Sequence, residues 1–486
     1  MSDHDSIRSL EPRPLWNTFV ELNAIPRASK KEAAVSAFVA DRGRKLNLET
    51  VVDSLGNVLI RKPASVGYET HPAVVLQSHI DMVWQKNADT DFDFDTQGIK
   101  MFVDGDWVRA RGTTLGADNG IGVSTIFSVL ESSTILHPPL ECIFTIDEET
   151  GMTGAKELDP SWLKGRVLLN LDTEQDNELT IGCAGGANVT ANATYQCDQI
   201  GHGFDAFRIH VRGLKGGHSG VDIHLGRANA NKLMNRLLYL AAKKFGLRLG
   251  PLEGGSLRNA IPRESVATVF IPSTNTASFV AWIAFETKTI QHENGITDPE
   301  LQVVCQRTTA ASSEVVPIHT QRAILSVVSG VISGIHRMSP SIAGLVQTSN
   351  NLARVVVGAG EIAVLCLARS SVDSERDALS DSLTSVLDQL NGTVETSGQY
   401  PGWQPEPHSN IVQLMHSLYV EMFHEEPHVA ACHAGLECGI IGSKFPGMEM
   451  ISFGPNITGA HSPDECVQIS SVQKFYRYFQ KTLERL

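Results

Sequence analysis

Apolar and polar residues in the first part of the 486-residue chain follow helical spacing and then strand spacing. Helical spacing covers 15–22 and 30–46, with a break at Pro26. Strand spacing covers 49–53 and 57–61, with a glycine between the two segments. This order predicts two amphipathic helices followed by a pair of strands.

Three apolar runs later in this region each end in acidic or imidazole side chains. The runs cover 73–78, 140–146 and 167–171, and each has the length of a buried strand. Residues 120–131 have the pattern of a helix that connects the first two of these strands. In open α/β sheets, ligands and chemistry gather at the carboxyl ends of the strands. The candidate residues at these ends are His79 and Asp81 after the first strand, Asp147, Glu148 and Glu149 after the second, and Asp172 after the third.

The pattern changes after residue 186. Residues 187–398 mix Thr- and Val-rich strands with long helical segments, and a segment rich in Pro and Gly follows near 398–407. The long helical segments are 227–244, 277–291 and 321–337. We predict an α/β domain with a mixed central sheet, formed by 1–186 and 399–486, into which an α+β domain is inserted.

Charge and composition exclude one class of partner. The 54 acidic residues outnumber the 40 basic residues, which gives a net charge of −14. A protein that binds the phosphate backbone needs a basic surface. Aromatic residues, at 6%, are too few for rows of base-stacking rings. We therefore expect no nucleic-acid partner.

The sequence also indicates a cellular compartment. No run of about 18 apolar residues is present, so we expect no membrane-spanning helix and no membrane partner. Residues 1–5 are acidic and lack the apolar segment of a secretory signal. The eight cysteines are dispersed and form no Cys-x-x-Cys pair, which is typical of thiols in a reducing compartment. The sequence predicts a cytoplasmic protein.

Two of the candidate groups have an ordinary structural interpretation when each is taken alone. His79 and Asp81 would lie on the same face of a strand, and a metal-bound imidazole commonly donates its other N–H to a carboxylate. A histidine at a strand end that is merely capped by an aspartate fits the same pattern equally well. Asp118 stands in a Gly-rich turn before a helix, where an isolated aspartate is more often an N-cap.

The candidate groups are more specific when they are taken together. The adjacent carboxylates of 147–149 repel one another unless a cation is present, which weakens their interpretation as a solvated loop. Asp172 ends the third strand, and His461 stands in a turn rich in Gly and Pro near the C-terminus. Two imidazoles with three or more carboxylates form the mixed set that suits zinc, whereas Mg²⁺ and Ca²⁺ sites rarely use histidine.

In order, spacing and flanking residues, these groups resemble the co-catalytic di-zinc metallopeptidases related to aminoacylase and carboxypeptidase G. The resemblance covers essentially the whole chain and is strongest to the family's dipeptidases of the Xaa-His type. The segments that carry it are HIDMV at 79–83, TTLGADNG at 113–120, DEETGMTG at 147–154 and GGHSG at 216–220.

The resemblance implies two zinc ions per chain, for which Co²⁺ or Mn²⁺ can substitute. It implies that Asp118 bridges the two metals. His79 and Asp172 would complete one site, and Glu149 and His461 would complete the other.

The resemblance also implies the catalytic roles. Asp81 would orient His79, and Glu148 would be the general base that takes a proton from a metal-bridging water. The Asp118–Asn119 peptide bond would be cis. The inserted domain would act as a lid and supply His218 as a donor to the developing oxyanion, whereas a histidine among glycines would otherwise be read as part of a turn.

Four further residues are candidates for substrate contacts. Arg369 follows an apolar run and would bind the substrate's C-terminal carboxylate, although arginines at strand ends are mostly solvated. Asn259 would make a polar contact. Gly435 would line the pocket from the catalytic domain, and Glu437 would meet the substrate amine, although a lone glutamate is more often on the surface.

The function implied is metal-dependent hydrolysis of unblocked dipeptides, including Xaa-His dipeptides such as β-alanyl-histidine (carnosine). A tripeptide aminopeptidase or an N-acyl amino acid deacylase would share the metal centre. A catalytically silent peptide-binding protein is a remote alternative, because such relatives would be expected to have lost a ligand or the base. The resemblance also implies a homodimer, and productive binding is expected to need closure of the two domains.

Overall fold

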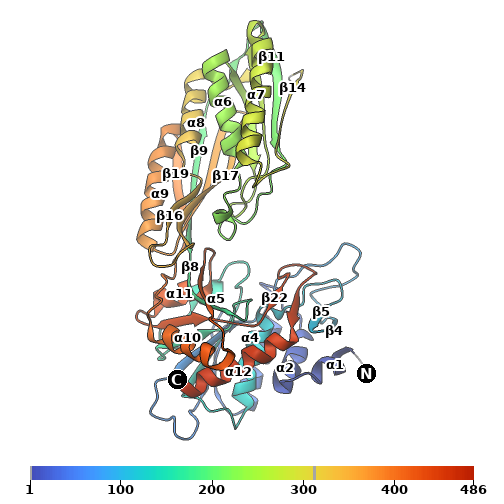
Figure 1. The fold of residues 1–486 in the computed structure, drawn as a ribbon, viewed down its shortest axis with the longest axis vertical. Coiled ribbons are helices and arrows are strands. Elements are labelled where there is room, and N and C mark those ends of the chain that lie inside the picture. The colour runs from blue at the N-terminus through green and yellow to red at the C-terminus, as the bar shows by residue number, and fades with distance from the viewer. Residues whose placement is uncertain (1–2, 310–312) are drawn as a thin grey trace. The chain divides into compact units, whose positions relative to one another are not determined.

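The computed structural model describes residues 3–309 and 313–486, which form two compact units (Figure 1). The first unit contains the chain up to Gly182 together with Pro405–Ala431 and Leu436–Leu486. The second contains Cys183–Gln404 and Cys432–Gly435. Residues 1 and 2 of the acidic N-terminal segment lie outside the described ranges.

Three short segments of the predicted α/β domain belong to the second unit instead, namely 183–186, 399–404 and Cys432–Gly435. From the sequence, Gly435 and its neighbours are expected in the final part of the α/β domain, whereas Cys432–Gly435 belongs to the second unit. The backbone explains the difference, because the N–H group of Ala184 donates to the carbonyl groups of Cys432 and Ala434, at 3.0 Å each.

The first unit is built on an eight-stranded sheet of mixed direction. β3 lies between β6 and β7 and pairs in parallel with both, and β21 pairs in parallel with β7. β1, β2 and β6 pair antiparallel in succession. The predicted mixed central sheet is therefore confirmed. In spatial order its strands are β1 (Glu49–Val52), β2 (Val58–Lys62), β6 (Leu140–Thr145), β3 (Val74–His79), β7 (Val167–Asn170), β21 (Glu449–Ser452), β8 (Glu178–Cys183) and β20 (His428–Cys432).

Helices bury this sheet, and a small second sheet completes the unit. Every residue of β3 and β6 is buried, which is why both strands read as continuous apolar runs. Leu15, Phe19 and Leu22 recur on one face of α2, which packs on α4. The helices are α1 (Asp3–Arg8), α2 (Arg13–Asn23), α3 (Ala33–Lys45), α4 (Ala117–Glu131), α5 (Thr153–Glu157), α10 (Asn410–Phe423), α11 (Glu437–Lys444) and α12 (Ile469–Arg485), and the small sheet has the order β22 (Ile457–Thr458), β23 (Cys466–Gln468), β5 (Trp107–Ala110) and β4 (Met101–Asp104).

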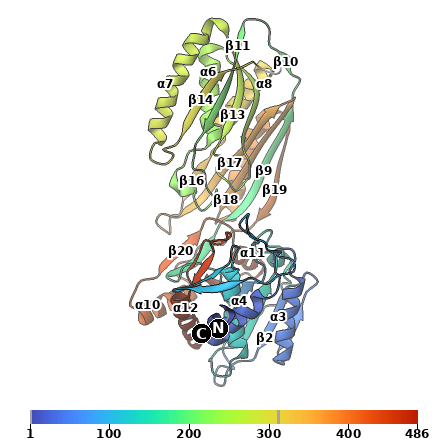
Figure 2. The same cartoon turned by 90° about the vertical axis from the view of Figure 1, so that its right-hand side faces the viewer.

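The second unit is an α+β domain with a nine-stranded antiparallel sheet, as the sequence predicts. Its helices α6 (Ala230–Phe245), α7 (Thr276–Asn294), α8 (Ile318–Gly330) and α9 (Asp373–Leu387) lie on one face of the sheet (Figures 1 and 2). The strand order is β14 (Gln302–Arg307), β11 (Phe204–Arg212), β13 (Ser265–Pro272), β12 (Arg248–Gly255), β17 (Val346–Gly358), β18 (Glu361–Ser370), β9 (Gly185–Thr194) and β19 (Thr393–Tyr400); β16 (Gly334–Met338) pairs with β17, and β10 (Asp198–Gln199) pairs with β15 (Glu314–Val315).

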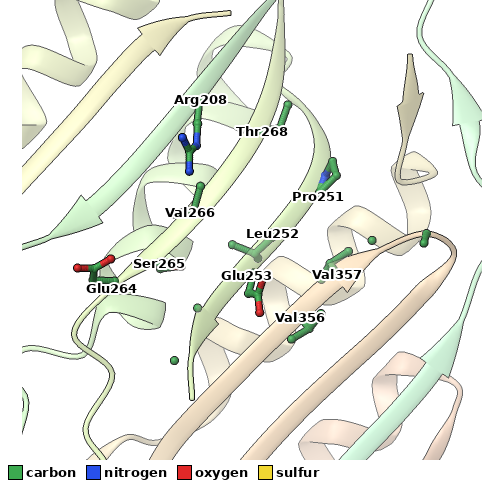
Figure 3. A pocket seen from close by; sticks show the side chains of 14 residues that line it. Arg208, Pro251, Leu252, Glu253, Glu264, Ser265, Val266, Thr268, Val356 and Val357 are labelled. Atoms are coloured by element: carbon green, nitrogen blue, oxygen red, sulfur yellow. The ribbon is translucent and has the colours of Figure 1, made fainter. Parts of the chain in front are cut away.

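Alternate residues of this sheet lie in different surroundings. Ile209, Val269 and Val364 are buried in the core beneath the helices. The opposite face carries Arg208 and Thr268, which line an open depression (Figure 3). One covered face and one open face account for the alternating Thr- and Val-rich strands in the sequence.

One predicted helix is shorter than its sequence pattern indicates. The pattern predicts a helix over 321–337, but α8 ends at Gly330 and β16 begins at Gly334. Gly334 has a φ of 111°, which a helix cannot contain. Among the described helices, none is long and apolar enough to cross a membrane.

The two faces of β11 give a test of this packing. Ile209→Ala should lower the free energy of unfolding by about 2–5 kcal/mol, because it leaves a cavity in the core of the second unit. Arg208→Ala, one residue away on the open face, should change it by less than about 0.5 kcal/mol. Urea unfolding followed by circular dichroism measures both, and equal effects would contradict the assignment of faces.

Candidate metal centre and active site

The candidate metal-binding side chains gather at one edge of the central sheet. β3, β6 and β7 are parallel neighbours, so their carboxyl ends lie together. His79 ends β3, Glu148 and Glu149 follow β6, Asp172 follows β7, Asp118 lies in the first turn of α4, and His461 lies in the loop between β22 and β23. The Asp118–Asn119 peptide bond is cis, as the resemblance implies.

One group of side chains surrounds the imidazole of His79, which is 1% exposed. Its Nε2 lies 3.1 Å from Oδ1 of Asp118 and 3.4 Å from Oδ1 of Asp172. The donor atoms of these three residues all lie within 4.8 Å of one another, so they could hold one metal ion.

A second group surrounds the imidazole of His461. Its Nε2 lies 3.0 Å from Oε2 of Glu149 and 3.4 Å from Oδ2 of Asp118. These three residues also have their donor atoms within 4.8 Å of one another. Asp118 therefore belongs to both groups, with Oδ1 toward one imidazole and Oδ2 toward the other.

The charges at this edge fit a pair of divalent cations. Hydrogen bonds with Asp118 and Glu149 raise the pKa of His461 to about 11, so the carboxylates strongly favour positive charge beside them. Oε1 of Glu149 is buried and has no hydrogen-bond partner among the described residues, although buried polar atoms are nearly always paired. Imidazole nitrogens and carboxylate oxygens form a donor set that transition-metal ions accept.

Asp81 holds both the first imidazole and the loop after β6. Its carboxylate lies 3.2 Å from Nδ1 of His79 and accepts a hydrogen bond of 2.8 Å from Oγ of Ser29. It also accepts the backbone N–H groups of Glu148 at 3.1 Å and Glu149 at 3.3 Å. Because Nδ1 of His79 donates to Asp81, Nε2 keeps its lone pair for a metal.

Glu148 has the environment of a residue that transfers protons. Burial raises the pKa of its carboxyl group well above the usual value. The negative charges of Asp172 and Glu149 raise this pKa further, whereas the charge of His79 lowers it. A carboxyl group that titrates nearer to neutral pH can take up a proton and return it during one catalytic cycle.

Three residues that contact candidate site residues were not themselves identified from the sequence as part of the site. Nδ2 of Asn119 donates to the carbonyl of Leu171 at 2.8 Å and also to the carboxylate of Asp172, which it holds in place. Ser29, which donates to Asp81, stands in an ordinary loop, so no motif marks it. Gln77 did carry a signal, because it is a polar residue within an apolar strand and shares a face with His79.

Glu437 lies within the first unit and is 1% exposed. Its Oε2 accepts hydrogen bonds of 2.6 Å from Nε2 of Gln77 and from Oγ1 of Thr145, and its Oε1 has no partner among the described residues. The expectation that a lone glutamate is most often on the surface is wrong here.

The other candidate residues lie in the second unit. His218 is held by its own loop, because its Nδ1 accepts the backbone N–H groups of Gly220 at 3.2 Å and Val221 at 3.0 Å. The proton of the neutral imidazole is therefore on Nε2. Burial lowers the pKa of His218, and the charge of Arg369 lowers it further. His218 is thus a neutral donor whose Nε2–H has no part in these loop hydrogen bonds.

Arg369, near the end of β18, is a buried cation that forms no ion pair with an acidic side chain of residues 3–309 or 313–486. The residue is 4% exposed, and its Nη1 donates a hydrogen bond of 2.9 Å to the hydroxyl of Tyr400. Its Nε has no hydrogen-bond partner, and no carboxylate of the described residues forms an ion pair with it. A buried guanidinium in this state is suited to bind an anion.

The two remaining candidates are placed by the backbone. Asn259 is exposed, and its carbonyl accepts the N–H group of Ser219 at 2.7 Å, next to His218. Gly435 ends the segment Cys432–Gly435 of the second unit.

Residues 75–485 match Peptidase family M20/M25/M40. The chain belongs to this family. The M20 peptidase is 38% identical over 481 residues to the cytosol non-specific dipeptidase of Escherichia coli (strain K12), which covers 99% of each chain. It is 42% identical to the aminoacylhistidine dipeptidase of Vibrio alginolyticus, whose crystal structure it matches with a TM-score of 0.93 over 99% of this chain and 98% of that one.

A more distant structure shares the fold of this M20 peptidase. It is aminopeptidase PepT of Bacillus cereus ATCC 10987, which is 16% identical and matches with a TM-score of 0.57 over 98% of each chain.

The shared carboxylate predicts a pattern of metal binding. Metal-stripped protein should bind two equivalents of Zn²⁺ in a calorimetric titration, and His461→Ala should bind one. Asp118→Ala should weaken both binding steps, because its carboxylate belongs to both groups. His408→Ala, which removes an exposed histidine of the same unit, is the control and should still bind two. Two tight equivalents in Asp118→Ala would contradict a shared carboxylate.

Proposed function

We propose that this M20 peptidase is a cytoplasmic, zinc-dependent dipeptidase that hydrolyses unblocked dipeptides, including Xaa-His dipeptides such as β-alanyl-histidine. The observation that carries the proposal is the pair of side-chain groups that share Asp118 and could each hold a metal ion, together with Glu148, whose carboxyl pKa is raised by burial. It is supported by the names of two relatives that span nearly the whole chain, a cytosol non-specific dipeptidase and an aminoacylhistidine dipeptidase.

The metal ions would be held by His79, Asp118 and Asp172 in one site and by Asp118, Glu149 and His461 in the other. When bound, they would supply Lewis acidity, which polarises the scissile carbonyl and lowers the pKa of a bound water molecule toward neutral pH. Asp81 acts through His79 and through the N–H groups of the loop after β6, which it holds.

Glu148 carries the proton in this proposal. Its carboxylate takes a proton from the attacking water while the water oxygen bonds to the carbonyl carbon of the peptide. The carboxyl group then gives that proton to the nitrogen of the leaving amine as the C–N bond breaks. Acid–base catalysis of this kind contributes about 10²–10⁴-fold in rate.

Most of the groups proposed to recognise the substrate belong to the second unit, and Glu437 belongs to the first. Nε2–H of His218 donates to the oxygen that becomes negative as the carbonyl is attacked. The guanidinium of Arg369 binds the C-terminal carboxylate, with Tyr400 fixing one of its nitrogens. Asn259 and Gly435 contribute further polar and backbone contacts, and the unpartnered Oε1 of Glu437 is proposed to meet the free amine.

A tripeptide aminopeptidase or an N-acyl amino acid deacylase would use the same metal centre. Dipeptidase activity is favoured because the relatives with 38% and 42% identity are both dipeptidases by name, whereas PepT, at 16%, shares the fold alone. A silent peptide-binding protein is disfavoured because every expected metal-binding residue and Glu148 are present. The homodimer stays a prediction.

The central test is hydrolysis of β-alanyl-histidine and of a plain dipeptide by metal-stripped and Zn²⁺-restored protein. Activity should disappear on stripping and return with zinc. Glu148→Ala should lower kcat by about 10²–10⁴-fold and still bind two metals. Glu157→Ala, an exposed glutamate nearby in sequence, is the control. Faster hydrolysis of N-acetylated amino acids than of either dipeptide would replace the dipeptidase with a deacylase.

The anion site predicts a separate effect on substrate binding. Arg369→Ala should raise KM for dipeptides by about ten- to a hundredfold, because it removes a hydrogen-bonded charge pair with the substrate carboxylate. Dipeptide amides, which lack that carboxylate, should be cleaved equally by the variant and the wild type. A loss that is the same for acids and amides would contradict this role.

A further inference from the structure

The loop that carries Asp118 is held by one buried carboxylate from the far end of the chain. Glu465, which is 3% exposed, accepts the backbone N–H groups of four consecutive residues. Its Oε2 accepts from Leu115 at 2.7 Å and Gly116 at 2.9 Å, and its Oε1 accepts from Ala117 at 2.8 Å and Asp118 at 3.3 Å.

Side chains from the end of α2 and the segment after it hold carbonyl groups of the same loop and of Asp81. Nη2 of Arg27 donates to the carbonyl of Gly116 at 2.5 Å, and Nη1 donates to the carbonyl of Asp81 at 2.8 Å. Nδ2 of Asn23 donates to the carbonyl of Leu115 at 3.0 Å. Both the N–H groups and the carbonyl groups of the backbone before Asp118 are therefore hydrogen-bonded. Their partners are side chains near the two ends of the sequence.

Close packing leaves this loop little freedom to relax. Gly116 has a φ of 71°, and a Cβ atom there would lie 2.4 Å from Nη2 of Arg27. Loss of one contact would therefore shift the loop as a body and move the carboxylate of Asp118 with it.

Glu465 is also tied to His461. The N–H group of Glu465 donates to the carbonyl of Ser462 at 3.1 Å, and the N–H group of Ser462 donates to the carbonyl of Gly459 at 3.1 Å. These bonds form the tight turn that contains His461, and β23 begins directly after Glu465. Glu465 thus connects the segment that carries Asp118 with the segment that carries His461.

We propose that Glu465 is a positioning residue that sets the spacing between Asp118 and His461, and so affects the metal affinity of the group formed by Asp118, Glu149 and His461 more strongly than that of the group around His79. This inference rests on the proposed metal centre. Residues that orient metal ligands typically change affinity or activity by about 10–100-fold when they are replaced.

The test is calorimetric titration of full-length, metal-stripped protein with Zn²⁺. Glu465→Gln replaces one acceptor oxygen by an amide that faces backbone donors, so part of the loop loses its partners. Its affinity for the equivalent that His461→Ala loses should fall about 10–100-fold, and its affinity for the other equivalent should fall less. If the Gln variant does not fold, Glu465→Asp, which keeps the charge but draws it back by one methylene, is titrated in the same way.

The matched control is Glu141→Gln. Glu141 is also 3% exposed and accepts two backbone N–H groups, from Lys164 at 2.8 Å and Gly165 at 2.9 Å, but it has no part in the metal groups. This variant should bind both equivalents like the wild type. Wild-type binding in Glu465→Gln, an equal loss at both equivalents, or the same loss in Glu141→Gln would overturn the inference. Wild-type protein that binds no metal would overturn the proposed function as well.

Discussion

Electrostatic repulsion among the carboxylates around Asp118 is the constraint on which the rest of this site depends. Two like charges 4 Å apart repel by about 4 kcal/mol at an effective dielectric constant of 20. Asp118, Asp172 and Glu149 all lie within hydrogen-bond range of an imidazole, and in the described part of the chain none of them forms an ion pair with a lysine or arginine. Added positive charge stabilises such a cluster, and two divalent ions would supply it.

The fold holds these like charges together by making their surroundings rigid. Parallel pairing of β3 with β6 and β7 brings three loops to one sheet edge, and complete burial of β3 and β6 fixes the strands beneath them. Buried polar groups next to the candidate metal-binding residues are hydrogen-bonded to one another. Asp81 fixes one imidazole and the loop that follows β6. In the backbone before Asp118, Arg27 binds a carbonyl group and Glu465 binds the N–H groups.

Much of the catalytic sheet follows from local sequence, because an apolar run such as 73–78 specifies a buried strand without knowledge of its neighbours. The length of α8 could not be predicted from local sequence, because Gly334 belongs to a strand through its pairing with β17. Sequence spacing identified the acidic groups as candidates, but the separate roles of Glu148 and Glu149 came from the family resemblance. Arg27 and Glu465 could not be found in this way, because their partners are backbone atoms that only the folded chain brings near them.

The central claim is that Asp118 bridges two metal ions. A crystal structure of the zinc-loaded protein, with anomalous data collected at the zinc absorption edge, tests it most directly. We expect two anomalous peaks about 3.5–4 Å apart, each within bonding distance of a different oxygen of Asp118, with His79 and Asp172 at one peak and Glu149 and His461 at the other. A single peak, or two peaks of which only one touches Asp118, would contradict it.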